Sequence, residues 1–137
     1  MSHLEYFSYP GFGETTRQQF WFNQAVRIGD RIEISGQGGW DPTTGSLQEG
    51  ISYPDEIDSA FSNVDLALKH AGGKGWPQVY SVKIYMADLS KEGLAVITRY
   101  LKMWMPDHQP LLTVVGVAKL ALPGMRIEVE VCAHVSG

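Results

Sequence analysis

Two stretches of the chain repeat apolar residues at three- and four-residue steps, which predicts two amphipathic helices. The first runs from Pro54 to Ala71, with acidic residues in its first turn and Lys69 and His70 in its last. Ser90 can cap a second helix that extends to about Met105, and Pro106 ends it.

Period-two alternation predicts strands elsewhere. The clearest runs from Gly124 or Met125 to Val135 and turns Glu128, Glu130, Cys132 and His134 to one side, with five apolar residues on the other. Shorter runs predict strands at Leu4–Tyr9, Phe20–Ile28, Arg31–Gly36, Gln78–Met86 and Leu111–Leu120.

Two details of the sheet follow from these runs. Gly29-Asp30 predicts a tight hairpin between the second and third strands. In Gln78–Met86, strict alternation places Tyr80 with the core residues and Val79 on the opposite face.

The order of these elements predicts one two-layer α+β domain over residues 1–137, with both helices on one face of the sheet. The other face would then carry Val79, Tyr85 and Cys132 without a covering layer. An apolar open face on so small a domain predicts self-association.

Composition narrows the function classes. The formal charge of −4 and the pI of about 5.5 argue against a nucleic-acid partner, because phosphate binding needs a basic face. Cys132 stands alone, so an internal disulfide or a zinc–thiolate cluster is excluded. No apolar run spans a membrane and no secretory signal precedes the first strand. A cytoplasmic location is expected, with a mitochondrial one left open.

The carboxylates of Glu128 and Glu130 are the first candidates for chemistry. They lie two residues apart on one side of the last strand, so their repulsion can raise one pKa and create a general acid or base. The alternative is a solvated outer face of the sheet.

Other side chains give weaker signals. The four histidines lack metal-ligand spacing, so no metal site is expected. His108 follows the second helix in a loop, where it is free to meet a ligand or simply exposed. Trp40 lies in the Gly-rich loop Gly38–Gly50 rather than in a periodic element, which favours a place beside a pocket. Cys132 is expected to be inert.

Taken in order, several segments resemble the RidA/YjgF reactive-intermediate deaminase family. The resemblance extends from about Trp21 to Ala133, and it rests on the order and spacing of Asn23–Asp30, Ile34–Gln37, Asp41–Gly45, Asn63–Asp65, Ala71–Gly73, Val82–Asp88, Val115–Leu120 and Ile127–Glu130. It implies a chorismate mutase-like fold with a mixed six-stranded sheet, and a homotrimer with ligand clefts between subunits. It also implies cofactor-independent hydrolysis of 2-imino or 2-enamino acids, with an arginine on the substrate carboxylate and a glutamate on the attacking water.

The site that the resemblance implies is kept only in part. Glu128 stands at the family's glutamate, and Ser35 and Gly36 are kept. Leu112 stands at the position of the family's arginine, and Phe22 stands at the position of a family tyrosine. Asn23, from a matched segment, and Thr113, beside Leu112 in the segment 108–113, complete the predicted substrate-binding set with Trp40 and His108.

The missing arginine changes the expected ligand. Removing a buried charged partner costs about 3–5 kcal/mol, a factor of hundreds to thousands in affinity. Unless another subunit supplies Arg99 or Lys119, the ligand is expected to be neutral and more apolar, such as an aromatic or polyketide-like metabolite.

Three functions stay open at this point. The first is a divergent family member in specialised metabolism that uses Glu128 for imine or enamine hydrolysis, tautomerisation, dehydration or cyclisation. The second is a non-catalytic trimeric binding or chaperone-like module. The third is an ordinary 2-iminobutyrate/2-iminopropionate deaminase. An endoribonuclease, a label that some family members carry, is the least favoured because the chain is acidic.

Overall fold

A mixed six-stranded sheet organises the computed structural model, which describes residues 1–135. The strands lie in the order β1-β2-β3-β6-β4-β5, so the C-terminal strand is central. Only β4 and β5 are parallel; the other neighbours are antiparallel. The strands are β1 (Glu5–Phe7), β2 (Ala25–Ile28), β3 (Arg31–Ile34), β4 (Val79–Met86), β5 (Leu111–Gly116) and β6 (Ile127–His134). The α+β class and the mixed sheet agree with the sequence prediction.

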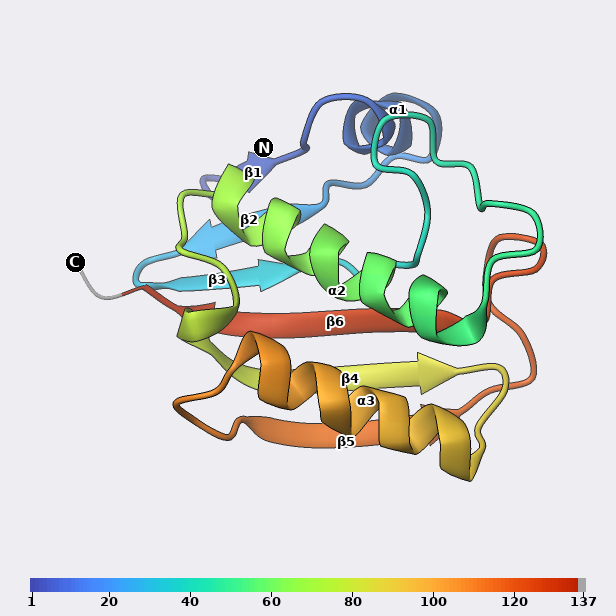
Figure 1. Ribbon diagram of the computed structural model, residues 1–137. Helices are drawn as coiled ribbons and strands as arrows, with labels where there is room; N and C mark the ends of the chain where they lie inside the picture. Colours follow the sequence, from blue (N-terminus) through green and yellow to red (C-terminus); the bar gives the residue numbers. More distant parts are fainter. Residues whose placement is uncertain (136–137) are drawn as a thin grey trace.

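Three helices and a 3₁₀ turn complete the described chain. They are α1 (Phe12–Gln19), α2 (Tyr53–His70), η1 (Trp76–Gln78) and α3 (Lys91–Trp104). In Figure 1, α2 crosses in front of β3 and β6, and α3 runs in front of β4 and β5. The short α1 lies apart from both, beyond the β1–β2 edge of the sheet.

A serine caps the N-terminus of each of the two long helices, α2 and α3. The hydroxyl of Ser52 accepts a hydrogen bond from the backbone N–H of Asp55 at 3.2 Å, and Ser90 does the same for Gly93 at 3.0 Å. The apolar row of α2 is fully buried against the sheet, as its periodicity predicts; it comprises Ile57, Ala60, Phe61, Val64 and Leu68.

Strand β6 fixes the two faces of the sheet. Its odd-numbered residues, Ile127, Val129, Val131 and Ala133, are at most 3% exposed and form the centre of the core. The even-numbered residues from Glu128 to Cys132 are half-buried on the opposite face. The predicted alternation of this strand is therefore confirmed.

The alternation expected for β4 is wrong at its first residues. Val79 is 1% exposed and belongs to the core, whereas Tyr80 is 38% exposed. The pairing with β6 shifts register between Val79 and Ser81, where β4 carries a β-bulge. An inserted residue reverses the faces of everything before it, so a strict two-residue period fails there.

The helix α1 was not predicted, and the second strand begins at Ala25 rather than Phe20. The sequence of α1 is short and polar, and Gly11 precedes it without a side-chain cap. Contacts from distant segments hold it instead; for example, the N–H of Phe12 donates to the carbonyl of Pro42 at 2.9 Å. After α1, Trp21 adopts a left-handed φ of 64°, which separates the helix from the strand.

The end strands are also shorter than predicted. The first covers Glu5–Phe7 instead of Leu4–Tyr9, and β5 ends at Gly116 instead of Leu120. The buried Tyr9 belongs to the loop before α1, where its side chain contacts the core.

Two tryptophans in the core give a matched test of the packing. The indole N–H of Trp76 donates to the carbonyl of Phe61 at 2.8 Å, whereas the indole nitrogen of Trp104 is buried with no partner among residues 1–135. We expect Trp76→Phe to destabilise the fold by about 1 kcal/mol more than Trp104→Phe, because only the first change removes a hydrogen bond that the fold makes. Chemical denaturation measures the free energy of unfolding of both variants. Equal losses would contradict a stabilising hydrogen bond from Trp76.

Candidate functional site

Glu128 of β6 points away from the core into a pocket of about 330 Å³. Four parts of the chain surround it: α1, the segment 20–22, the end of β3 with the loop after it, and the loop 121–125. The lining residues are Phe12, Thr16, Phe20, Phe22, Ser35, Gly36, Trp40, Ala121, Leu122, Met125 and Glu128. Glu128 is the one ionisable side chain among them, and it stands in mainly apolar surroundings.

Gly36 is the residue that lets Glu128 lie in this position. A Cβ atom at Gly36 would come within 2.6 Å of both Cγ and Cδ of Glu128. Contacts that short essentially never occur, so any larger residue at Gly36 would push the carboxylate aside. The requirement for glycine there is steric, since its φ is not in the left-handed region.

The two glutamates of β6 are in different environments. The hydroxyl of Tyr85 donates to Oε1 of Glu130 at 2.5 Å, so Glu130 has a protein partner. Glu128 accepts no hydrogen bond from any side chain within residues 1–135. Burial raises the pKa of Glu128 above its usual value, and the neighbouring charge of Glu130 raises it further. An unpartnered carboxyl group with a raised pKa is suited to proton transfer.

A buried hydrogen-bonded chain holds one wall of the pocket in place. The indole N–H of Trp40 donates to the hydroxyl of Tyr9 at 3.2 Å, and that hydroxyl donates to Oε1 of Gln37 at 2.9 Å. Burial raises the pKa of Tyr9 to about 12, so its hydroxyl stays protonated and keeps donating. Trp40 is thereby fixed in one orientation.

The same chain continues to α1. The side-chain amide of Gln37 donates to Oε1 of Gln24 at 2.6 Å, and the amide of Gln24 donates to the hydroxyl of Thr16 at 2.7 Å. Thr16 donates in turn to the carbonyl of Gly13 at 2.9 Å. The amide of Gln37 also donates to the carbonyl of Ser35 at 3.0 Å. The chain joins two walls of the pocket, Trp40 and α1.

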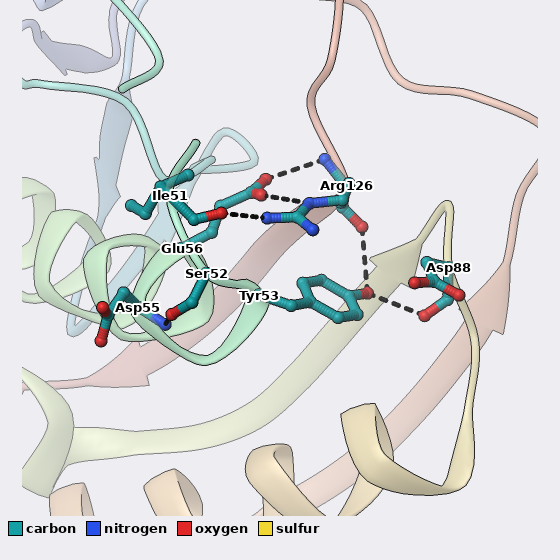
Figure 2. A network of polar contacts seen from close by, with 7 residues as sticks. All are labelled: Ile51, Ser52, Tyr53, Asp55, Glu56, Asp88 and Arg126. Atoms are coloured by element: carbon teal, nitrogen blue, oxygen red, sulfur yellow. Dashed lines mark hydrogen bonds and ion pairs between the residues drawn. The ribbon is translucent and has the colours of Figure 1, made fainter. Parts of the chain in front are cut away.

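An ion pair anchors the start of β6, two residues before Glu128. Figure 2 shows the carboxylate of Glu56 accepting hydrogen bonds from the backbone N–H of Arg126 at 2.8 Å and from its Nε at 2.7 Å. The guanidinium also donates to the carbonyl of Ile51 at 2.8 Å and lies 4.8 Å from the ring centre of Tyr53. Glu56 is 1% exposed, so this pair ties α2 to the strand that carries Glu128.

The structure brings five of the nine predicted site residues together. Phe22, Ser35, Gly36, Trp40 and Glu128 all line the pocket. Asn23 lies beside it: its backbone carbonyl accepts the hydroxyl of Ser35 at 2.7 Å, and its side chain lines a neighbouring hollow with Glu33 and Glu130.

The remaining three predicted residues lie elsewhere in this chain. Nε2 of His108 is 2.7 Å from the carbonyl of Val79, which gives it a structural partner. Leu112 and Thr113 are exposed on the edge strand β5. By register, Thr113 is on the same face of the sheet as Glu130. Leu112 pairs with the core residue Val82 and is therefore on the other face, the one that the long helices cover.

Several lining residues were missed or placed differently by the sequence. Phe12 and Thr16 belong to α1, whose polar sequence carries no clear helical period. Phe20 was expected at the start of a strand, but it lies between α1 and β2. Leu122 lies in the loop before β6 and had no signal of its own, because a loop's path depends on what it packs against. Met125 was expected at the start of the last strand, but β6 begins at Ile127 and Met125 lies in the loop before it.

Other parts of the described chain offer less chemistry. A larger hollow of about 550 Å³ lies between the loop after β3 and α2, with polar lining that includes Asp41, Asp58 and Ser62. Within residues 1–135, no three potential metal ligands come together, and no helix has the length and apolarity to cross a bilayer. Burial raises the pKa of the Cys132 thiol, so the sulfur stays protonated.

Comparison with known proteins places the chain in a family. Residues 16–135 match the family described as Endoribonuclease L-PSP. A RutC family protein of Aquifex aeolicus is 34% identical over 114 residues, which are 82% of this chain and 86% of that protein. The human 2-iminobutanoate/2-iminopropanoate deaminase is 33% identical over 113 residues, covering 82% and 78%.

Solved structures agree with this result. RidA from a Psychrobacter species superposes with a TM-score of 0.71 at 30% identity, covering 83% of this chain and 88% of that one. A YjgF/YER057c/UK114 family member from Mycobacterium tuberculosis gives a TM-score of 0.78 at 22% identity, covering 96% and 99%, and supports the fold alone.

The ion pair at the start of β6 is open to a direct test. We expect Glu56→Ala to lower the free energy of unfolding by about 1–3 kcal/mol, because it removes two charge-assisted hydrogen bonds from Arg126, whose guanidinium stays partly solvated. Denaturant unfolding measures this loss. Asp30→Ala, which removes the exposed ion pair with His134, serves as control and should change little. Equal small effects for both would show that β6 is not anchored in this way.

Proposed function

The chain belongs to the Endoribonuclease L-PSP family, which includes RidA and YjgF, and on that premise we propose that it is an acid–base enzyme acting on a small neutral metabolite. Imine or enamine hydrolysis is the reaction that we favour; tautomerisation, dehydration and cyclisation need the same proton transfers. The observation that carries the proposal is the unpartnered carboxyl group of Glu128 in an apolar pocket.

The proposed hydrolysis needs only Glu128 and water. The carboxylate of Glu128 takes a proton from a water molecule while the oxygen of that water bonds to the imine carbon. The C=N electron pair moves to nitrogen. Glu128 returns that proton to nitrogen, which gives a neutral carbinolamine. It then moves the hydroxyl proton to nitrogen, the C–N bond breaks, and ammonia leaves as the carbonyl forms. The net reaction converts R₂C=NH and H₂O into R₂C=O and NH₃.

The charge of the lining supports a neutral substrate. No lysine, arginine or histidine lines the pocket, and leucine stands at position 112, where the family resemblance expects an arginine. A substrate carboxylate would therefore enter apolar surroundings without a cation and beside Glu128, which is unfavourable on both counts.

A homotrimer with clefts between subunits is part of the proposal. The edge strand β5 exposes Leu111 at 71%, Leu112 at 44% and Val115 at 42%, so it offers unpaired backbone and apolar side chains to a neighbour. In such an assembly, Leu112, Thr113 and His108 would meet the pocket of another subunit. Cytoplasmic location and a role in specialised metabolism complete the proposal.

The ordinary deaminase stays as a second candidate, because curated relatives at about one-third identity carry the name 2-iminobutanoate/2-iminopropanoate deaminase. A matched pair of substrates separates the two. Butan-2-imine carries a methyl group in place of the carboxylate of 2-iminobutanoate. Faster turnover of the neutral imine supports the proposal, and faster turnover of 2-iminobutanoate supports the second candidate. Turnover of neither by the intact protein supports a binding module.

Two substitutions on one strand test the role of Glu128. We expect Glu128→Gln to lower kcat for the preferred imine by about 10²- to 10⁴-fold, because the amide cannot take up the proton of water. Glu130→Gln, two residues along β6 and bonded to Tyr85, is the matched control and should keep most of the activity.

The pH profile of the wild-type enzyme adds a second readout. The base form of Glu128 is needed first, so kcat/KM should fall on the acid side at a pH set by the raised pKa of Glu128. Undiminished turnover in Glu128→Gln would refute the proposal.

A further inference from the structure

The side-chain hydrogen-bond donors that line the pocket of Glu128 are already in use. The hydroxyl of Ser35 donates to the carbonyl of Asn23 at 2.7 Å, and that of Thr16 to the carbonyl of Gly13 at 2.9 Å. The indole N–H of Trp40 donates to Tyr9. A ligand therefore meets no free hydroxyl or N–H donor among the lining side chains of this chain, and a ligand N–H that donates to the ionised carboxylate of Glu128 would give both groups a partner.

The rest of the pocket is aromatic and partly open. Phe12 and Trp40 meet edge to face with ring centres 5.1 Å apart and form a fixed inner wall. Phe20 and Phe22 line the same pocket but remain 59% and 43% exposed. These two rings gain burial only if something planar or apolar lies against them.

We propose that the pocket selects a ligand built on an aromatic or heteroaromatic ring with an N–H donor, either uncharged or cationic, and rejects its carboxylate analogue. The ring would lie against Phe20 and Phe22, and the N–H would donate to the carboxylate of Glu128. This inference rests on the proposed function for the choice of site, and it names the substrate class. It assigns Phe20 and Phe22 as specificity-determining residues.

Four probes of similar size test the proposal by binding alone. Benzamide and benzamidine carry a ring and N–H donors, benzoate carries a ring and a negative charge, and cyclohexanecarboxamide carries the donor without the aromatic ring. We expect titration of the full chain, followed by backbone amide shifts around Gly36, to show benzamide and benzamidine binding at least tenfold more tightly than benzoate. Benzamide should also bind more tightly than cyclohexanecarboxamide.

Substitutions locate the preference within the pocket. Phe20→Leu and Phe22→Leu keep an apolar side chain but remove a ring, so the affinity ratio of benzamide to cyclohexanecarboxamide should fall toward one. Phe7→Leu is the matched control. Phe7 lies on β1, packs against His70 at the end of α2, and lines no part of this pocket. Retained binding of cyclohexanecarboxamide shows that each variant is folded.

The result can overturn the inference without deciding the function. Benzoate binding as tightly as benzamide would overturn it, and so would the absence of binding by all four probes at millimolar concentration. Hydrolysis of butan-2-imine that depends on Glu128, together with no preference for aromatic probes, would reject the inference and keep the proposed function. Preference for the aromatic probes without any turnover would keep the inference and reject the proposed function.

Discussion

The site depends on one close approach, in which the side chain of Glu128 lies over the backbone of Gly36. The core side of β6 is occupied by apolar residues, so its even-numbered residues must face outward, and Gly36 leaves the space that Glu128 fills. Aromatic side chains around that space shield part of the carboxylate from solvent. Burial then favours the protonated form, and the charge of Glu130 two residues away acts in the same direction.

Two separate devices keep this arrangement rigid. On one side, the buried chain from Trp40 to Thr16 connects the loop after β3 with α1 through donors that all point the same way. On the other side, the pair of Glu56 and Arg126 fixes the beginning of β6 against α2. Neither device contacts the carboxyl group of Glu128 directly. Their role is to hold the walls and the strand, which is what a pre-organised site requires.

The sequence predicts the parts of the fold in which local pattern and burial agree. Strand β6 and helix α2 follow their periods closely, because each has one face in the core. The prediction fails where distant contacts decide. Helix α1 has a polar sequence and depends on Pro42 and Gln24, and the bulge at the start of β4 reverses the faces of Val79 and Tyr80.

The candidate site divides in the same way. Glu128, Gly36 and Ser35 are found through strand alternation and family resemblance, whereas Phe12 and Leu122 come from segments whose path no local pattern encodes. Leu112 is exposed on the edge strand β5 and does not line the pocket of its own chain, so its place in the candidate site depends on the proposed homotrimer. A direct measurement of Glu128 tests the central claim. Titration of its carboxyl carbon by NMR should give a pKa above that of an exposed glutamate, and higher than in a Glu130→Gln variant. A pKa at or below the value of an exposed glutamate would contradict the account.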